Sequence, residues 1–230
     1  MKLVVSLGML SVGAMMALAG CGSAQVEQKL QQTIATGAAP VVHVDNSAGD
    51  IRISGRARAA VDIEATKEAR NSDDLRNISV EVRRAGADLF VATKYGNGRH
   101  SGGVTYTISV PTDASVDVRN GAGTVDVARV NGNVAVVNQA GRITVKLGRV
   151  AARRAVDLSS AVGEVNLSIA RDSSAAVEAN TNVGAINSDF PSVSEIRENV
   201  VGAHANGKVG SGSARVRLTV GTGAINLKSS

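Results

Sequence analysis

The strongest signal in this sequence is an alternation of apolar and polar residues that recurs in six twelve-residue windows. The windows are VHVDNSAGDIRI from Val42, VDVRNGAGTVDV from Val116, VAVVNQAGRITV from Val134, VDLSSAVGEVNL from Val156, VEANTNVGAINS from Val177 and VRLTVGTGAINL from Val216. Valine stands first in every window, an apolar residue third, glycine eighth, isoleucine or valine tenth, and a polar residue eleventh. Each window therefore predicts two short strands that share an apolar face and are joined by a bend at a glycine with positive φ.

The spacing of the windows predicts how they assemble. The windows that start at 116, 134, 156 and 177 are 18, 22 and 21 residues apart. A period near twenty residues is typical of a β-solenoid, in which each rung pairs with the rungs above and below at about 4.8 Å. The sequence thus predicts an all-β solenoid with rungs of about 20 residues. An antiparallel sandwich of glycine-rich hairpins is the alternative, because Asn131-Gly132 is a favourable two-residue turn.

The fifth position of the window predicts a polar column at the bend. It holds Asn46, Asn120, Asn138, Ser160 and Thr181, and Val220 breaks the run. Stacked at one corner, such side chains can form a hydrogen-bonded ladder that satisfies backbone groups. A row of polar groups that reads a glycan is the functional alternative.

Two segments depart from the repeat. Between 61 and 110, VDIEAT, ISVEVRR, DLFVAT and VTYTISV predict strands of ordinary length, with a hairpin at residues 84–87 and a charged connection or helical turn at 67–77. We therefore expect an irregular β start over 41–111 and regular rungs over 115–230. From 189 to 213 the periodicity lapses, which predicts one degenerate rung or an excursion loop, a place where binding groups tend to lie.

The N-terminus predicts export and lipidation. Residues 1–20 carry Lys2, an apolar stretch too short for a typical membrane span, and small residues before Cys21. Leu18-Ala19-Gly20-Cys21 has the form of a bacterial lipobox, so we expect a lipoprotein signal peptide over 1–20 and a lipid on the Cys21 thiol. An ordinary signal peptide with an incidental cysteine is the alternative.

The polar residues 21–40 predict a lipid-anchored tether, within which residues 26–34 can form a short helix. The folded domain would then cover 41–230. Gly22 follows the cysteine where an aspartate commonly marks inner-membrane retention, so the expected location is the cell envelope, in the outer membrane if the organism is Gram-negative.

The composition excludes several classes of function. Cys21 is the only cysteine, so the exported domain has neither a disulfide framework nor a thiolate metal site. Aromatic residues make up 2% of the chain, so the core must be built from small β-branched side chains. The net charge of +5 is mild, and with few aromatic stacking groups it does not indicate a nucleic-acid partner.

No catalytic, metal or cofactor motif is found. Gly121-Ala122-Gly123 lacks the third glycine and the helix of a dinucleotide loop. His43, His100 and His204 have no metal-ligand spacing and are interpreted as surface or strand residues. The sequence therefore predicts a protein that is not an enzyme and has no cofactor.

One cluster of charge is a candidate binding site. Arg149, Arg153 and Arg154 lie together between two rungs, where they could form an anion-binding patch for lipopolysaccharide, teichoic or other acidic polymers. A solvated rim is the alternative interpretation of the same residues.

The order of these motifs resembles a known family. NSAGDIRISG, a charged middle, TYTISVP, and glycine-containing rungs that end in GTGAINL are similar to the bacterial putative-adhesin family, a domain of unknown function, over roughly Val41 to Lys228. The resemblance implies a right-handed β-helix or β-solenoid, secreted or membrane-anchored, and it brings no catalytic residues.

These observations predict a non-enzymatic, lipid-anchored envelope protein, an adhesin or binding scaffold that presents an elongated solenoid face. Its expected partners are the membrane, through the anchor, and an envelope polysaccharide or protein. A structural or envelope-stress accessory lipoprotein with no dedicated ligand is the alternative. A polysaccharide-acting enzyme would need clustered acids on one face, which the rungs do not show.

Overall fold

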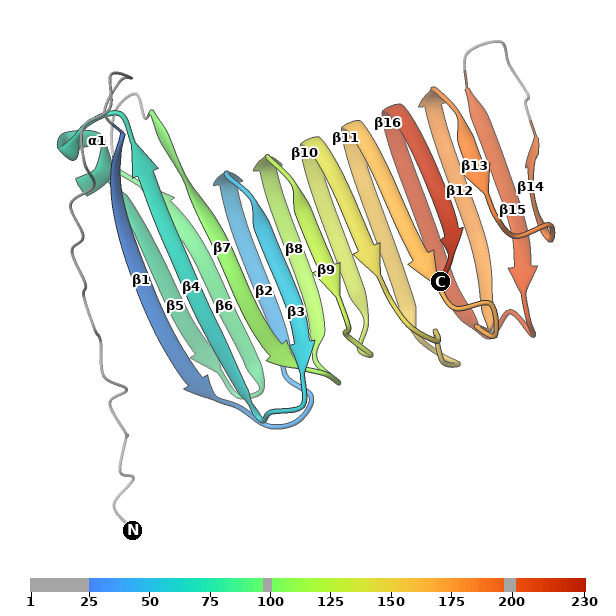
Figure 1. Ribbon diagram of the computed structural model, residues 1–230, viewed down its shortest axis with the longest axis horizontal. Coiled ribbons are helices and arrows are strands. Elements are labelled where there is room, and N and C mark those ends of the chain that lie inside the picture. The colour runs from blue at the N-terminus through green and yellow to red at the C-terminus, as the bar shows by residue number, and fades with distance from the viewer. Residues whose placement is uncertain (1–24, 97–100, 197–201) are drawn as a thin grey trace.

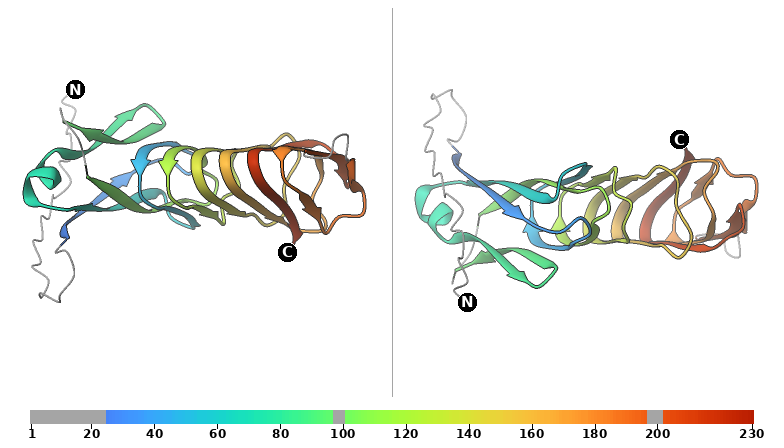
Figure 2. Two further views of the ribbon diagram at one scale, coloured as in Figure 1. Left: turned by 90° about the horizontal axis from the view of Figure 1, so that it is seen from above. Right: turned by 90° about the horizontal axis from the view of Figure 1, so that it is seen from below.

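The computed structural model describes residues 25–96, 101–196 and 202–230; the signal segment, Cys21 and His100 lie outside these ranges. Over the described residues the chain forms sixteen strands and one short helix. The strands lie across the long axis of an elongated stack, in two layers that face each other around the apolar core (Figures 1 and 2).

The six windows form the parallel part of the stack. Their first halves are β2 (Val41–Ala48), β8 (Ser115–Ala122), β12 (Ala175–Val183) and the first parts of β10 (Val134–Lys146), β11 (Ala155–Ile169) and β16 (Ala214–Ser229). Their second halves are β3 (Ile51–Arg56), β9 (Val125–Ala128), β13 (Ile186–Ser188) and the remainders of β10, β11 and β16. All pair in parallel and in register, so that each first valine faces the first valine of the next rung. The predicted solenoid is confirmed, and the antiparallel sandwich is wrong.

The spatial order of the rungs differs from their order in the chain. Strand β16, the last in sequence, pairs with β11 on one side and β12 on the other, so Val216 faces both Val156 and Val177. The segment 189–213 explains this order. It contains β14 (Val193–Ile196) and β15 (Ala203–Val209), which pair antiparallel with each other, and β15 also pairs antiparallel with β12 at the end of the stack. The predicted excursion is therefore a hairpin cap, and the chain returns from it into the gap between β11 and β12.

The other end of the stack is antiparallel. Strands β4 (Ala60–Ala69) and β7 (Gly102–Pro111) form one side, and the hairpin of β5 (Ile78–Ala85) and β6 (Asp88–Tyr95) forms the other. Strand β7 continues the stack by parallel pairing with β3, as β6 does with β2. The predicted hairpin turn contains Gly86 with φ +64°, and the predicted helical turn is α1 (Ser72–Arg76), whose N-cap Asn71 accepts a hydrogen bond from the Asp74 N–H at 2.8 Å.

The predicted helix near residue 26 is wrong. Residues 26–35 form strand β1 (Val26–Ala35), which pairs antiparallel with β4 along its whole length. The apolar residues Val26, Leu30 and Ile34 are four apart, a spacing that suits one face of a helix and equally one face of a strand. The segment forms a strand rather than a helix because it pairs with the uncovered edge of β4 and packs its apolar residues against the core. Only residues 22–25 then separate Cys21 from the first strand, whereas the predicted tether extends over residues 21–40.

The eighth-position glycines line one corner of the stack. All six have φ between +118° and +143°. A Cβ on Gly163 would lie 1.8 Å from the carbonyl oxygen of Gly141, and one on Gly223 would lie 1.7 Å from that of Gly163. Glycine is thus required both by the backbone angle and by the close approach of the neighbouring rung. We call this line of bends the glycine corner.

The predicted polar column is present and buried. The Asn46 amide Nδ2 donates to Asn120 Oδ1, and Asn120 Nδ2 donates to Asn138 Oδ1, both at 3.2 Å. Asn138 is 0% exposed, so the column cannot read a glycan and that alternative is wrong.

The column extends to the antiparallel end and stops at the fourth rung. Thr93 Oγ1 donates to Asn46 Oδ1 at 2.8 Å and lies 2.7 Å from the Tyr106 hydroxyl, whose pKa burial raises to about 12. Ser160 is in register with Asn138 and Val220, and its buried Oγ has no hydrogen-bond partner in the described part of the chain. The ladder of side-chain hydrogen bonds therefore ends at Asn138, and Val220, on the other side of Ser160, offers no polar atom.

Candidate functional site

A groove on one outer face of the stack, formed by residues that the structure describes, is a candidate binding site. It has a volume of about 470 Å³ and crosses four strands, β5, β6, β2 and β8. It is lined by His43, Val44, Asp45, Glu81, Arg83, Phe90, Ala92, Lys94, Asp117 and Arg119. Because side chains alternate along a strand, the valines next to these residues point into the core while the polar and aromatic residues point outward.

The centre of the groove is a row of four side chains in register. Arg83, Phe90, His43 and Asp117 occupy paired positions on adjacent strands. The Arg83 guanidinium lies 4.3 Å from the centre of the Phe90 ring, and the His43 ring stacks on Phe90 with centroids 4.6 Å apart and planes 8° apart. His43 Nδ1 lies 3.2 Å from Asp117 Oδ2. The row is therefore a stacked platform held at both ends by charged groups.

A second hollow extends the groove along the stack. It has a volume of about 390 Å³, shares Asp45 and Arg119 with the first, and reaches Val137 and Gln139 on β10. Val137 is 48% exposed, which is unusual for valine in this chain. The combined groove offers carboxylates, cations, an aromatic edge and an apolar patch, a mixture that suits sugar rings or an extended peptide.

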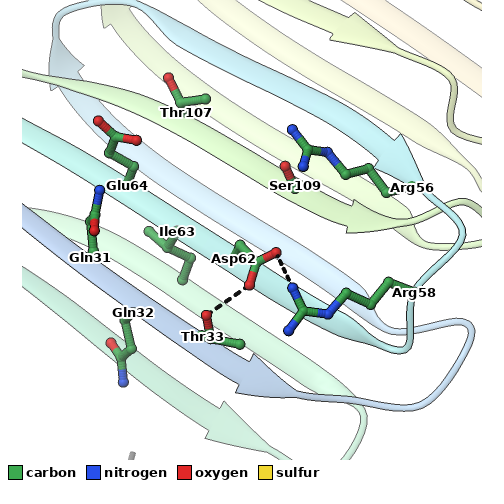
Figure 3. Close-up of a pocket in the computed structure, with 10 residues that line it drawn as sticks. All are labelled: Gln31, Gln32, Thr33, Arg56, Arg58, Asp62, Ile63, Glu64, Thr107 and Ser109. Carbon is green, nitrogen blue, oxygen red and sulfur yellow. Dashed lines mark hydrogen bonds and ion pairs between the residues drawn. The ribbon is translucent and has the colours of Figure 1, made fainter. Parts of the chain in front are cut away.

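The opposite outer face has a smaller hollow of about 290 Å³, shown in Figure 3. Asp62 is its most connected side chain: Thr33 Oγ1 donates to Asp62 Oδ1 at 2.7 Å, and Arg58 Nη1 donates to Asp62 Oδ2 at 3.0 Å. The guanidinium of Arg56 borders the same hollow and forms no ion pair among the described residues. This hollow is polar and lacks an aromatic platform.

The three arginines predicted as a patch share one loop but have different surroundings. Arg149 Nε lies 3.6 Å from Asp172 Oδ2, and both side chains are exposed. The Arg153 N–H donates to the Ser213 carbonyl at 3.1 Å, in a left-handed backbone conformation with φ +64°. Arg154 is partly buried, and its Nη1 has no hydrogen-bond partner in the ranges that the structure describes.

The histidines occupy strand positions, as expected for His43 and His204. His204 Nδ1 contacts Asn180 Oδ1 on the neighbouring strand β12. No group of three or more His, Cys, Asp or Glu side chains within the described ranges could hold a metal ion. Among the same residues, no helix has the length and apolarity needed to cross a membrane.

The groove was not among the sites predicted from the sequence. Its strands come from segments around residues 43, 83, 90 and 117, whose adjacency no local pattern reveals. One signal was available: in DLFVAT, Leu89 and Val91 occupy the inward phase of the alternation, so Phe90 is an aromatic residue in the outward phase.

Comparison with known proteins supports the fold and the family. A search of curated proteins finds no match. A solved structure described as a putative cell adhesion protein from Clostridium sporogenes is 16% identical, with a TM-score of 0.66, and the match covers 89% of this chain and 100% of that chain. A putative adhesin from Bacteroides fragilis is 13% identical over 86% of this chain and 96% of that chain, but its TM-score of 0.35 is too low to bear on the fold.

The family assignment comes from the sequence. The family model described as Toastrack DUF4097 matches residues 42–228, nearly the whole of the solenoid and its antiparallel end. This range agrees with the resemblance found from the motifs NSAGDIRISG, TYTISVP and GTGAINL. The protein therefore belongs to the Toastrack DUF4097 family.

Proposed function

We propose that this protein is a non-enzymatic envelope protein, anchored by a lipid on Cys21, that binds an external polysaccharide or protein in the groove across β5, β6, β2, β8 and β10. The Leu-Ala-Gly-Cys motif supports the anchor. The structural similarity to a protein described as a putative cell adhesion protein supports binding outside the cell.

The row Arg83–Phe90–His43–Asp117 is the observation that carries the binding site. The chain has two phenylalanines; Phe190 is buried, whereas Phe90 lies on the outer face within the row. Packing of the core does not require a large aromatic side chain there, since the inward neighbours Leu89 and Val91 supply the core contacts. Aromatic and arginine side chains are enriched where proteins bind partners.

The groove is also organised before any ligand arrives. Arg83 and His43 hold the two faces of Phe90, and Asp117 holds His43, so the ring presents its edge in one position. Three carboxylates and three Lys or Arg side chains line the same hollow, so the formal charges of these six groups balance. This balance favours a neutral or mixed-charge ligand such as a glycan over a highly charged polymer.

A capture experiment tests the proposal. A soluble Cys21→Ser form would be immobilised and offered labelled cell-wall polysaccharide and outer-membrane fractions. We expect saturable capture of one fraction, and a His43→Ala/Phe90→Ala variant should bind it at least about tenfold more weakly, equivalent to about 1.4 kcal/mol.

The matched control is Arg52→Ala/Thr107→Ala, a pair in register on the opposite outer face. It should bind like the parent. Capture of no fraction, or equal capture by the groove variant, would refute the groove and favour an accessory lipoprotein with no dedicated ligand. The anchor is tested separately: the native chain should incorporate labelled fatty acid, and Cys21→Ser should not.

A further inference from the structure

The edge of the stack opposite the glycine corner carries a row of cations. Strands β3, β9, β10, β11 and β16 are consecutive layers of the stack, and all end along the same long edge (Figure 1). Each of these five strands has a lysine or arginine among its last two residues or in the first three residues of the loop that follows. We call these residues the basic edge: Arg56, Arg129, Lys146, Arg149, Arg171 and Lys228.

The register brings these residues into line although they are far apart in sequence. Ser54, Ala128, Lys146, Ser168 and Lys228 are paired positions on the five strands. Lys228 therefore lies two layers from Lys146, because β16 is inserted beside β11. With a strand spacing of about 4.8 Å, the five layers span about 19 Å.

The cations of the basic edge form few ion pairs. Arg149 pairs with Asp172, but the two side chains are 70% and 68% exposed, so the pair neutralises little. The other five cations are exposed and form no ion pair among the residues that the structure describes. At the glycine corner, by contrast, Arg142 pairs with Glu164 at 3.0 Å.

Folding does not require this arrangement. Like charges gathered along one edge repel one another and lower stability slightly. Arg129 adds a backbone cost, because its φ of +57° is in the left-handed region, where glycine would be unstrained. A row of exposed cations kept at a cost to stability indicates an anionic partner.

We propose that the basic edge binds an extended polyanion, a linear polymer with phosphate or carboxylate groups along its length, that lies parallel to the stack axis. The charge and the linear layout both match such a polymer. This site is distinct from the groove, whose lining charges are balanced, and the proposal goes beyond the groove's ligand.

The position of the anchor favours a polymer over the bilayer as the partner. Strand β1 starts at Val26, paired with Ala69 beside α1, and ends near the basic edge, where the Thr36 N–H donates to the Ala59 carbonyl. The ten residues of β1 span about 33 Å, whereas the chain from Cys21 to Val26 reaches about 17 Å. If Cys21 is lipidated, as proposed above, the bilayer lies nearer the α1 end of β1 than the basic edge.

Defined probes test the proposal with the soluble Cys21→Ser form. Fluorescent polyphosphate and polygalacturonate would be titrated, with neutral dextran and anionic lipid vesicles in parallel. We expect both polyanions to bind, dextran not to bind, and affinity to fall steeply between about 50 and about 300 mM NaCl. Arg129→Glu/Lys146→Glu/Lys228→Glu should weaken polyanion binding by more than about tenfold.

The control has the same change in net charge elsewhere. Arg70→Glu/Arg76→Glu/Arg142→Glu reverses three exposed cations away from the basic edge and should leave most of the affinity. Equal loss in both variants, absence of polyanion binding, or binding to anionic vesicles alone would overturn the proposal. If the triple reversal does not fold, Lys146→Gln/Lys228→Gln should still weaken binding severalfold. His43→Ala/Phe90→Ala should bind polyanions unchanged, so failure of the groove and of the basic edge are distinguishable.

Discussion

The glycine corner and the basic edge are the two long edges of the same rungs, and they obey different constraints. At the glycine corner, each bend lies against the carbonyl of the neighbouring rung, so no side chain fits at the eighth position. At the basic edge the connections vary in length, from residues 57–59 to residues 147–154, and the side chains of the six cations are exposed. The first edge is dictated by backbone packing, and the second is free to vary. Binding groups are therefore expected on the second edge and on the outer faces, rather than at the bends.

The largest loss of stability is expected from a substitution in the glycine corner. Gly163→Val places a Cβ 1.8 Å from the Gly141 carbonyl oxygen and forces a β-branched residue to a φ of +142°. We expect a loss of more than about 4 kcal/mol in the free energy of unfolding, measured by urea denaturation. Gly148→Val, in an exposed loop with free space around it, is the control and should cost little. Equal losses would contradict the packing argument.

A smaller effect is expected from the polar column beside the corner. Asn120→Ala leaves the Asn46 amide without Oδ1 as acceptor and removes the donor to Asn138 Oδ1. Because these groups are buried, we expect a loss of about 2 to 3 kcal/mol in unfolding free energy. If Asn120→Ala loses less unfolding free energy than a substitution of an exposed residue such as Arg119→Ala, the ladder is not stabilising.

For Ser160, in the same column, we expect the opposite change in stability. Its buried hydroxyl has no partner in the described chain, so Ser160→Ala removes an unsatisfied polar group. We expect stability to stay equal or rise by up to about 1 kcal/mol, whereas Asn120→Ala lowers it. Thermal unfolding of the two variants side by side measures the difference, and a clear loss for Ser160→Ala would mean that the hydroxyl is satisfied.

The smallest effect on stability is expected at Arg129, where stability and polyanion binding should change in opposite directions. Arg129→Gly relieves the left-handed backbone and removes one cation. We expect stability to rise by up to about 1 kcal/mol while polyanion affinity falls. Arg129→Lys, which keeps both the charge and the strain, should change neither quantity much. A fall in stability for the glycine variant would refute the strain at this residue.

The sequence was most informative about what recurs. The first valines, the eighth glycines and the fifth-position asparagines were assigned to core, bend and ladder from the repeat, and the structure confirms each role. These roles follow from chain geometry that every rung shares, so one alignment of the windows reveals them. The break at Val220 was visible for the same reason, and it leaves the buried hydroxyl of Ser160 without a polar neighbour on that side.

The candidate sites were less predictable, because each is assembled from distant segments. The Arg83–Phe90–His43–Asp117 row needs β6 to lie between β5 and β2, and β2 to lie beside β8. Of the basic edge, only Arg149 belonged to the predicted patch. Arg56, Arg129 and Lys228 are distant from Arg149 in the sequence, and strand pairing brings them to the same edge.

By itself, then, the sequence determined the rung: its strands, its bend, its core layer and its family. The tertiary structure alone decided the order of the rungs, the pairing of β1 with β4, and the two surface sites. The physical reason is that the six windows present nearly identical apolar faces and edges, so local pattern does not distinguish one neighbour from another. The choice depends on which strand edges remain uncovered when the end hairpins have formed, and that is a property of the whole chain.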